Sequence, residues 1–273
     1  MTRYNPSFVK KSSLLIALIM VMGYMSFKWQ SSTIDQSELT DNSSGSAAAQ
    51  TSSNNSPVSR IEFLTSVFKD IKPPPKVARI VLQKASQTEK DSVLYALNWS
   101  NETNNNALST LLKSELLEFH GEGSIEEIAR ECIFLAASQI NDEKQRDFLF
   151  QTGKKWIDEG LNKDEENMPL RNALIIYQSE YLNQPMVFLK TLRASQKIDS
   201  SDVELNFIHL NLLKKSNQWQ KAIQKCEKLV SLQPQNPYWL FEMSDLYGTM
   251  GDSANAKVYL NLAIERQRKQ SEK

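Results

Sequence analysis

The sequence predicts an all-α protein in which helical hairpins stack into a solenoid behind one N-terminal transmembrane helix. Residues 12–29 are almost wholly apolar. From Val58 onward the apolar residues recur at about the 3.6-residue spacing of an amphipathic helix, and not at the two-residue spacing of a strand. In the C-terminal half, equivalent residues return every 34 positions, and a fixed period of that length is typical of repeat architectures.

Composition narrows the class of protein further. Lys plus Arg and Asp plus Glu balance at 32 each, which argues against a generally basic nucleic-acid binder, so we expect no nucleic-acid partner. Hydrophobic residues make up 40% of the 273 residues, enough to build a core. Only 8 Gly and 9 Pro are present, too few for the many tight turns of a β-sandwich or barrel.

The first predicted element is the membrane helix at residues 12–29. Its 18 residues would make a helix of about 27 Å, close to the thickness of a bilayer's hydrocarbon core. Lys28 is the only charge inside it and lies near one end, where a long side chain reaches the interface. The segment is therefore expected to act as an uncleaved anchor.

The flanking charges predict the orientation of this anchor. Arg3, Lys10 and Lys11 precede it, whereas the first acid of the chain is Asp35. By the positive-inside rule, residues 1–11 would be cytoplasmic and everything after the anchor extracytoplasmic. This predicts a single-pass membrane protein.

Two other interpretations of the same segment stay open. A cleaved signal peptide also begins with a charged region followed by an apolar one. However, Tyr24-Met25-Ser26 is a poor cleavage site, and the small residues Ala47-Ala48-Ala49 lie too far after the apolar region. A buried helix of a soluble domain is the third interpretation. Residues 30–57, which follow, are rich in Ser and Asn with little to bury, so we expect a disordered linker there.

The helical part divides into two predicted regions, degenerate hairpins at 58–165 and repeats at 166–273. Pro73-Pro74-Pro75 ends the first amphipathic stripe, which begins near Ile61, and a second starts at Val77. Further helices are predicted at roughly 90–99, 106–119, 124–139, 142–159, 169–182, 185–197, 202–215, 218–231, 237–249 and 252–268.

The 34-residue period is carried by small or apolar residues. A small residue at Ala222 or Ala256 would let the second helix of a hairpin approach the first, and larger residues would fill the layer to the next hairpin. Five series have this spacing: Phe188, Ala222 and Ala256; Leu192, Cys226 and Leu260; Ser195, Leu229 and Ala263; Ile176, Leu210 and Ser244; Ser179, Leu213 and Tyr247.

These residues resemble the tetratricopeptide repeat family. In the last repeat, Tyr247 occupies the position of the first-helix Tyr, Gly251 the turn, and Ala256 and Ala263 the second helix, while Pro234 holds the terminal Pro position of the repeat before. The resemblance divides the C-terminal region into repeats at about 169–202, 203–236 and 237–270, of which the first is degenerate. It implies a right-handed superhelical solenoid.

The resemblance also implies a concave groove, lined by first helices, that binds a protein or peptide ligand. Carrying the groove-facing positions of the family onto this sequence gives the candidate partner-binding residues Tyr177, Tyr181, Phe207, Asn211, Lys214, Tyr238, Phe241 and Asp245, with Glu180, Glu204 and Lys215 beside them. The family's carboxylate clamp is incomplete, since only Asn211 with Lys214 or Lys215 matches it. The alternative is that these are ordinary exposed helix residues.

No catalytic, cofactor-binding or metal-ligating residues are predicted. Cys132 and Cys226 lie in apolar helical stripes, where a thiol acts as a small core residue. His209 is expected to pack, and His120 to lie at a helix C-terminus. The pair Gly121-x-Gly123 has neither a preceding strand nor a third Gly, so it does not indicate a dinucleotide site.

Residues 266–273 extend the last helix with polar side chains. We interpret them as the polar cap that the end of a solenoid needs, and a basic contact surface is the alternative.

Taken together, these features predict a non-catalytic scaffold, tethered to a membrane, that binds a protein or peptide outside the cytoplasm. The layout is similar to that of membrane-anchored tetratricopeptide proteins of bacterial envelopes, which implies the periplasmic side of an inner membrane. The alternatives are a structural subunit of an envelope complex, and an enzyme or accessory subunit that uses residues 90–165. Homo-oligomerisation is left open.

Overall fold

The computed structural model describes residues 57–83 and 85–271, and every regular element in those ranges is a helix. The predicted cytoplasmic segment 1–11, the anchor 12–29 and nearly all of the linker 30–57 lie outside the described residues. Within the described ranges, none of the helices combines the length and the apolar character that crossing a membrane requires.

The helices follow one another with short connections. Their bounds are α2 Arg60–Asp70, α3 Pro75–Leu82, α4 Lys90–Glu102, α5 Asn106–His120, α6 Ile125–Ser138, α7 Glu143–Lys163, α8 Met168–Glu180, α9 Pro185–Ile198, α10 Val203–Lys215, α11 Trp219–Leu232, α12 Tyr238–Thr249 and α13 Ser253–Ser271, with a short 3₁₀ turn, η2, at Ala85–Gln87. Each predicted helix is present, with ends that differ by a few residues.

The 34-residue interval is present in the helices themselves. The second helices of the last three hairpins, α9, α11 and α13, begin at Pro185, Trp219 and Ser253, which are 34 residues apart. The C-terminal part of the chain is thus an all-helical array that resembles a tetratricopeptide solenoid.

Local sequence explains where the helices begin and where the chain turns between them. Seven helices start behind a Ser, Asn or Asp whose side chain accepts a hydrogen bond from the backbone N–H three residues later: Ser59, Asn105, Ser124, Asp142, Asn167, Asp202 and Asp252. Most hairpin turns contain one residue in the left-handed region, where Gly and Asn are favoured: Asn104, Asn183, Asn217 and Gly251.

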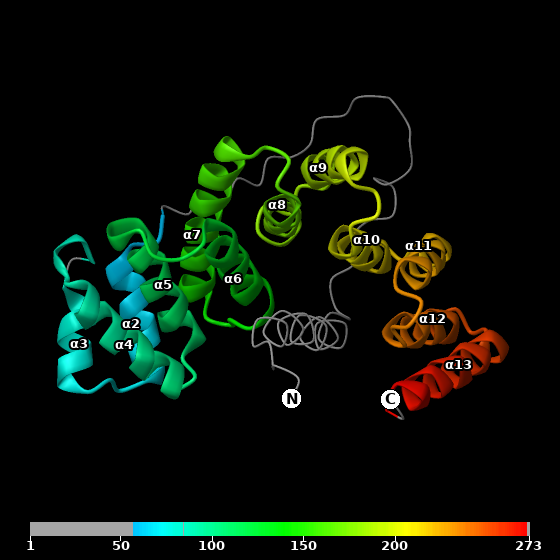
Figure 1. The fold of residues 1–273 in the computed structure, drawn as a ribbon, viewed down its shortest axis with the longest axis horizontal. Helices are drawn as coiled ribbons and strands as arrows, with labels where there is room; N and C mark the ends of the chain where they lie inside the picture. Colours follow the sequence, from blue (N-terminus) through cyan, green and yellow to red (C-terminus); the bar gives the residue numbers. More distant parts are fainter. Residues whose placement is uncertain (1–56, 84, 272–273) are drawn as a thin grey trace, which may run out of the picture.

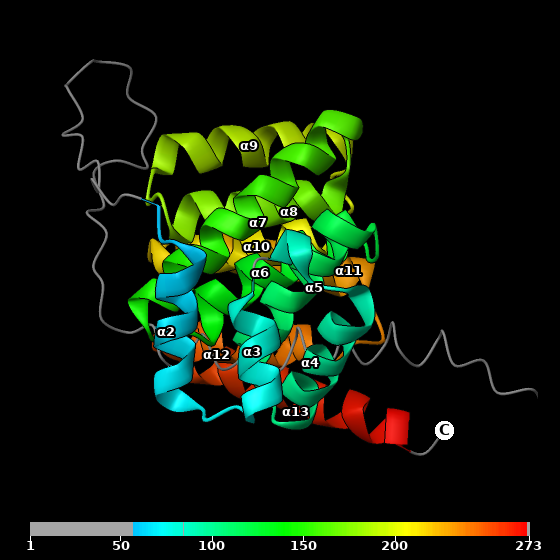
Figure 2. The same ribbon diagram turned by 90° about the vertical axis from the view of Figure 1, so that its left-hand side faces the viewer.

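The hairpins form an arc (Figure 1). Helices α6, α8, α10 and α12 lie along its inner side, and α7, α9, α11 and α13 lie outside them. Helices α2 to α5 form a bundle at one end, which shares its core with α6 to α8. In the view of Figure 2, α2 and α3 run nearly upright whereas α9 runs across the picture, so the N-terminal bundle does not continue the direction of the repeats.

The core along this arc is divided into three clusters. The N-terminal core joins α2 to α8 and includes Phe63, Cys132 and Trp156. A small middle cluster of Ile175, Phe188, Leu192, Leu205 and Ile208 lies between α8, α9 and α10. The C-terminal core joins α10 to α13 and includes Cys226, Trp239 and Ala263. Division of this kind is expected where each hairpin packs mainly on its neighbours.

The two cysteines are free and fully buried in different cores, so they do not form a disulfide. Burial raises the pKa of both thiols well above the ordinary value, with Glu131 and Glu242 adding to the rise. A thiol in that state is a poor nucleophile, which confirms the prediction that both act as small core residues.

Close approach of α6 and α7 depends on a glycine. A Cβ atom added to Gly153 would lie 2.7 Å from Ile133 Cδ1 and 3.0 Å from Cys132 Cβ. Gly248 is the contrasting case, because a Cβ atom there would meet nothing within 4 Å.

We therefore expect Gly153→Ala and Gly248→Ala to change stability in opposite directions. Overpacking at Gly153 should lower the free energy of unfolding by about 1–2 kcal/mol, since the clash outweighs the gain in helix propensity. At Gly248 the same methyl group should raise it by about 0.5 kcal/mol. Urea titration followed by circular dichroism measures both, and a destabilising Gly248→Ala or a neutral Gly153→Ala would contradict the packing described.

Candidate functional site

The inner side of α12 presents aromatic and acidic side chains together. Tyr238 and Phe241 are half-buried and Asp245 is exposed, and their spacing along the helix places them on one face. Asn211, half-buried on the neighbouring α10, lies at an equivalent position one repeat earlier. We call these four residues the inner-face patch, and all four were predicted as partner-binding residues.

Beneath the patch, aromatic side chains pack against one another. Phe207 is buried and contacts Tyr238 and Trp239 with ring centroids 6.0 Å and 5.4 Å away, and the Tyr238 and Trp239 rings meet edge to face at 4.8 Å. Phe207, another predicted partner-binding residue, therefore supports the patch from beneath and offers little area to a ligand. Such packing fixes the position of Tyr238.

Lys214 is engaged within the protein. Its Nζ donates to Glu242 Oε2 at 2.6 Å, while the Tyr238 hydroxyl donates to Glu242 Oε1 at 2.8 Å. Burial raises the pKa of Tyr238, and Glu242 adds to the rise. Because both oxygens of Glu242 and the charge of Lys214 are satisfied internally, this lysine is not available to bind an acidic ligand.

Asp245 differs from its neighbour Glu242. Partial desolvation of its carboxylate and the nearby charge of Glu242 raise its pKa, and Lys214 opposes the rise less strongly. Among the described side chains, none forms an ion pair or hydrogen bond with its carboxylate. Asp245 is thus the charged group that the patch presents outward.

Tyr177 and Tyr181 lie apart from the patch. Both pack against Phe150 of α7, with centroid distances of 6.0 Å and 4.8 Å, and against each other at 5.4 Å. Tyr177 is buried, which raises the pKa of its hydroxyl, with smaller effects of Tyr181 and Asp158. These two predicted residues therefore belong to the junction of α7 and α8.

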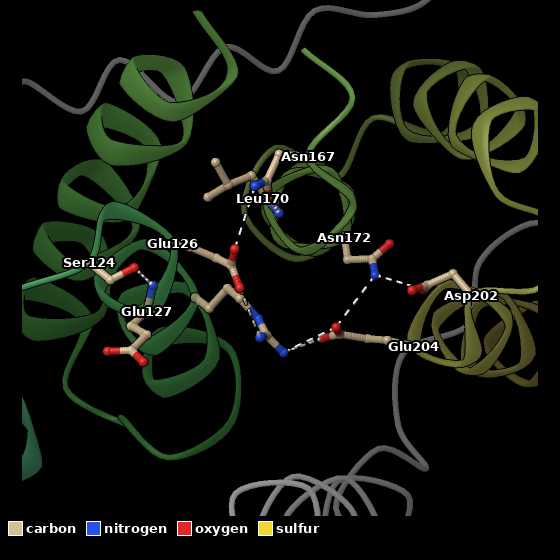
Figure 3. Close-up of polar contacts among 9 residues, drawn as sticks. Ser124, Glu126, Glu127, Asn167, Leu170, Asn172, Asp202 and Glu204 are labelled. Atoms are coloured by element: carbon tan, nitrogen blue, oxygen red, sulfur yellow. Dashed lines mark hydrogen bonds and ion pairs between the residues drawn. The ribbon is translucent and has the colours of Figure 1, made fainter. Parts of the chain in front are cut away.

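An ion pair joins α6 to α10 past the inner side of α8. Arg130 Nη2 donates to Glu204 Oε1 at 3.0 Å and Oε2 at 3.1 Å, and Arg130 Nη1 lies 3.8 Å from Glu126. Figure 3 shows Asn172 on α8 facing Asp202, the residue that caps α10, and Glu204 on α10, and its Nδ2 donates to them at 3.0 Å and 3.4 Å. Sequence reasoning missed this network, because Arg130 lies in a hairpin that lacks the period.

The network stabilises a carboxylate that is mostly removed from water. Burial raises the pKa of Glu204 and Asp202 adds to the rise, while Arg130 and Asn172 oppose it. Nearby, Lys215 donates to both oxygens of Glu180 at 2.9 Å and 3.0 Å, and burial lowers the pKa of Lys215 against the effect of Glu180. Like Lys214, Lys215 is thus neutralised within the protein.

A small cavity of about 50 Å³ lies between the hairpins α8–α9 and α10–α11. Its walls are mainly apolar and include Phe188, Leu212 and His209. Burial lowers the pKa of His209 to about 4, with Lys225, Lys221 and Lys228 adding to the effect, and the ring pairs with Gln196 at 3.0 Å. A neutral, hydrogen-bonded ring agrees with the prediction that His209 packs.

Within residues 57–83 and 85–271, His, Cys, Asp and Glu side chains do not gather in groups of three or more that could hold an ion. The arrangement that stands out chemically is the inner-face patch.

Comparison with known proteins gives similarity to solved structures alone. No family model matches the chain, and no curated protein matches it. Among solved structures the chain is similar to MamA 41-end from Desulfovibrio magneticus RS-1, with 14% identity over 69% of this chain and 98% of that one and a TM-score of 0.45. It is also similar to YrrB, described as a TPR protein with an unusual peptide-binding site, with 15% identity over 71% and 93% and a TM-score of 0.39.

We expect the ion pair between Arg130 and Glu204 to stabilise the arc, so the effects of substituting the two residues on the free energy of unfolding should not be additive. Arg130→Met leaves Glu204 poorly solvated and unpaired, and should lower the free energy of unfolding by about 1–2 kcal/mol. The double variant Arg130→Met, Glu204→Gln should regain part of that free energy of unfolding. Urea unfolding of the single and double variants measures the difference. Lys163→Met, which breaks the exposed pair with Glu159, is the control and should lower it by less than about 0.5 kcal/mol. Strictly additive effects of Arg130→Met and Glu204→Gln would contradict the coupling.

Proposed function

We propose that this chain is a non-catalytic scaffold that holds a protein or peptide segment on the inner side of its arc. The observation that carries the proposal is the inner-face patch, in which Tyr238, Phe241 and Asp245 share one face of α12. Aromatic side chains supply most of the energy at peptide and protein contacts, and a nearby charge gives specificity.

The side chains packed beneath the inner-face patch favour binding of a ligand without rearrangement of the patch. Tyr238 is fixed by Phe207, Trp239 and the bond to Glu242, so little side-chain entropy would be lost when a ligand docks. Because Lys214 and Lys215 are paired internally, the acidic-tail recognition of the family's carboxylate clamp is not part of this proposal.

We further propose that residues 12–29 tether the scaffold to a membrane and that the repeats lie on the extracytoplasmic side. The apolar length and the Arg3, Lys10 and Lys11 flank support this topology. A linker of about 28 residues at 30–57 would let the arc reorient at roughly 30 Å from the bilayer.

Photocrosslinking in native membranes tests the ligand site. A benzoylphenylalanine introduced at Phe241 should give an adduct with a specific polypeptide segment, because the new ring keeps the place of the old one. The same group at Lys190, which is exposed on α9 outside the arc, is the control and should not give that adduct. Asp245→Ala should reduce the Phe241 adduct several-fold.

The proposal would be wrong if the Phe241 and Lys190 positions gave the same products, or if Phe241 gave none. It would also be wrong if the Asp245→Ala variant, with unchanged circular dichroism, gave the adduct in full yield.

A reporter fusion tests the tether separately. Alkaline phosphatase fused after Lys273 should be active and remain in the membrane fraction, with an epitope tag at Met1 retained on the same chain. Deletion of residues 12–29 should leave the reporter inactive in the soluble fraction. An active reporter that has lost the tag would instead show a cleaved signal peptide, and an inactive reporter on the complete chain would contradict the orientation.

A further inference from the structure

Three lysines of α11 share one face of that helix. Lys221, Lys225 and Lys228 are separated by four and three residues, so their side chains lie on neighbouring turns. Lys221 is exposed, and Lys225 and Lys228 are half-buried. Glu227, the acid of the same helix, lies on a different face. We call Lys221, Lys225 and Lys228 the lysine row.

One buried side chain brings two of these ammonium groups together. Asn206 is 1% exposed, and its Nδ2 donates to the carbonyl oxygens of Ser200 and Asp202 at 2.9 Å and 2.7 Å. Its Oδ1 accepts from Lys225 Nζ at 3.1 Å, while Lys228 Nζ donates to the same Ser200 carbonyl oxygen at 2.6 Å. The two lysines therefore converge on the turn between α9 and α10, because Asn206 is fixed there.

The charges of the lysine row act on one another and on a neighbouring ring. Partial burial lowers the pKa of Lys225, and the charge of Lys228 lowers it further. Burial keeps the ring of His209 neutral, with all three lysines adding to the effect. Holding like charges together costs free energy, and an anion bound between them would offset that cost.

Carboxylates do not supply that anion in the part of the chain that the structure describes. None of them forms an ion pair with the lysine row, and Lys221 Nζ donates to the neutral Gln218 at 2.8 Å. Hydrogen bonds from Ser201 lower the pKa of Asp199, with a smaller effect of Lys228. The Asp199 carboxylate is thus near the row, but it accepts from the backbone N–H and the hydroxyl of Ser201.

The chemistry of the lysine row suits a dianionic phosphate group. A lysine ammonium group is a compact point charge with three N–H donors, and each one in the row gives a single donor to an acceptor among the described residues. A phosphate monoester carries a charge of about −2 and three acceptor oxygens, so it can bind two or three ammonium groups at once. A carboxylate has one charge and is bound best by the planar fork of arginine.

We infer that the lysine row is a binding site for the monoester phosphate group of a small molecule. The phosphate would lie between Lys225 and Lys228 and accept from both, with Lys221 at its edge. Helix α11, which carries the row, lies outside α10 on the arc, whereas the inner-face patch is on the inner side (Figure 1). The two sites are therefore separate.

Isothermal titration calorimetry with glycerol phosphate tests this site. The full chain in a neutral detergent is titrated at about pH 8 and constant ionic strength, where the probe is a dianion, with detergent alone as the blank. The result expected is saturable binding that weakens as sodium chloride is added, because the contact is between charges.

Substitutions locate the bound phosphate. Lys225→Gln and Lys228→Gln should each weaken binding by about tenfold, since each removes a charge-assisted hydrogen bond. Lys190→Gln removes the same charge from an exposed position on α9 and is the matched control, which should weaken binding by no more than about twofold. Circular dichroism of each variant verifies that the fold is retained.

Two further probes identify the chemistry of the ligand. Acetate and the diester glycerophosphoglycerol, which is a lipid head group, carry one charge each and should bind at least about tenfold more weakly than glycerol phosphate. The inference is overturned if glycerol phosphate shows no saturable binding, or if Lys225→Gln and Lys190→Gln weaken it equally. Equal or tighter binding of acetate would also overturn it, and equal or tighter binding of glycerophosphoglycerol would assign the site to a lipid head group instead.

Discussion

The structure depends on one constraint: a single helical hairpin cannot bury its own apolar faces, so the next hairpin must cover them. Cys226 and Leu192 are buried because a hairpin follows each of them, whereas their equivalent Leu260 on α13, after which no further hairpin is described, is 40% exposed. The three separate cores reflect the same constraint, since most packing joins neighbours in the array. It also leaves the inner side of α12 free to carry aromatic and acidic groups that the core does not need.

Polar contacts add to this stacking where apolar cover is thinnest. The middle cluster between α8, α9 and α10 is small, and it lies beside the cavity that contains His209. At the same junction, Arg130, Asn172 and Lys215 form hydrogen bonds and ion pairs with carboxylates on other helices. These bonds neutralise the cations near the inner side of α10, and Asp245, which is exposed on α12, is the acidic side chain that faces outward. The electrostatic character of the proposed binding surface thus follows from how the arc is held together.

The sequence predicted the helices and the repeat because both depend on local spacing. Periods of 3.6 and 34 residues place each helix within a few residues, and the burial of Cys132 and Cys226 follows from their apolar stripes. The sequence could not show how a neighbouring hairpin meets each face. Tyr177 and Phe207 therefore lie in packed aromatic clusters, although their positions in the repeat suggested open groove residues. The Arg130–Glu204 pair, 74 residues apart, had no periodic signal at all.

Thiol labelling of a shortened chain tests this account most directly, because the two cysteines report on different cores. Ending the chain at Gln235 removes α12 and α13, the cover of Cys226, and leaves the surroundings of Cys132 in the N-terminal core untouched. We predict that Cys226 then reacts with a maleimide at a rate near that of the unfolded chain, while Cys132 stays protected as in the complete protein. Joint protection or joint reactivity of the two thiols would contradict an array that is stabilised hairpin by hairpin.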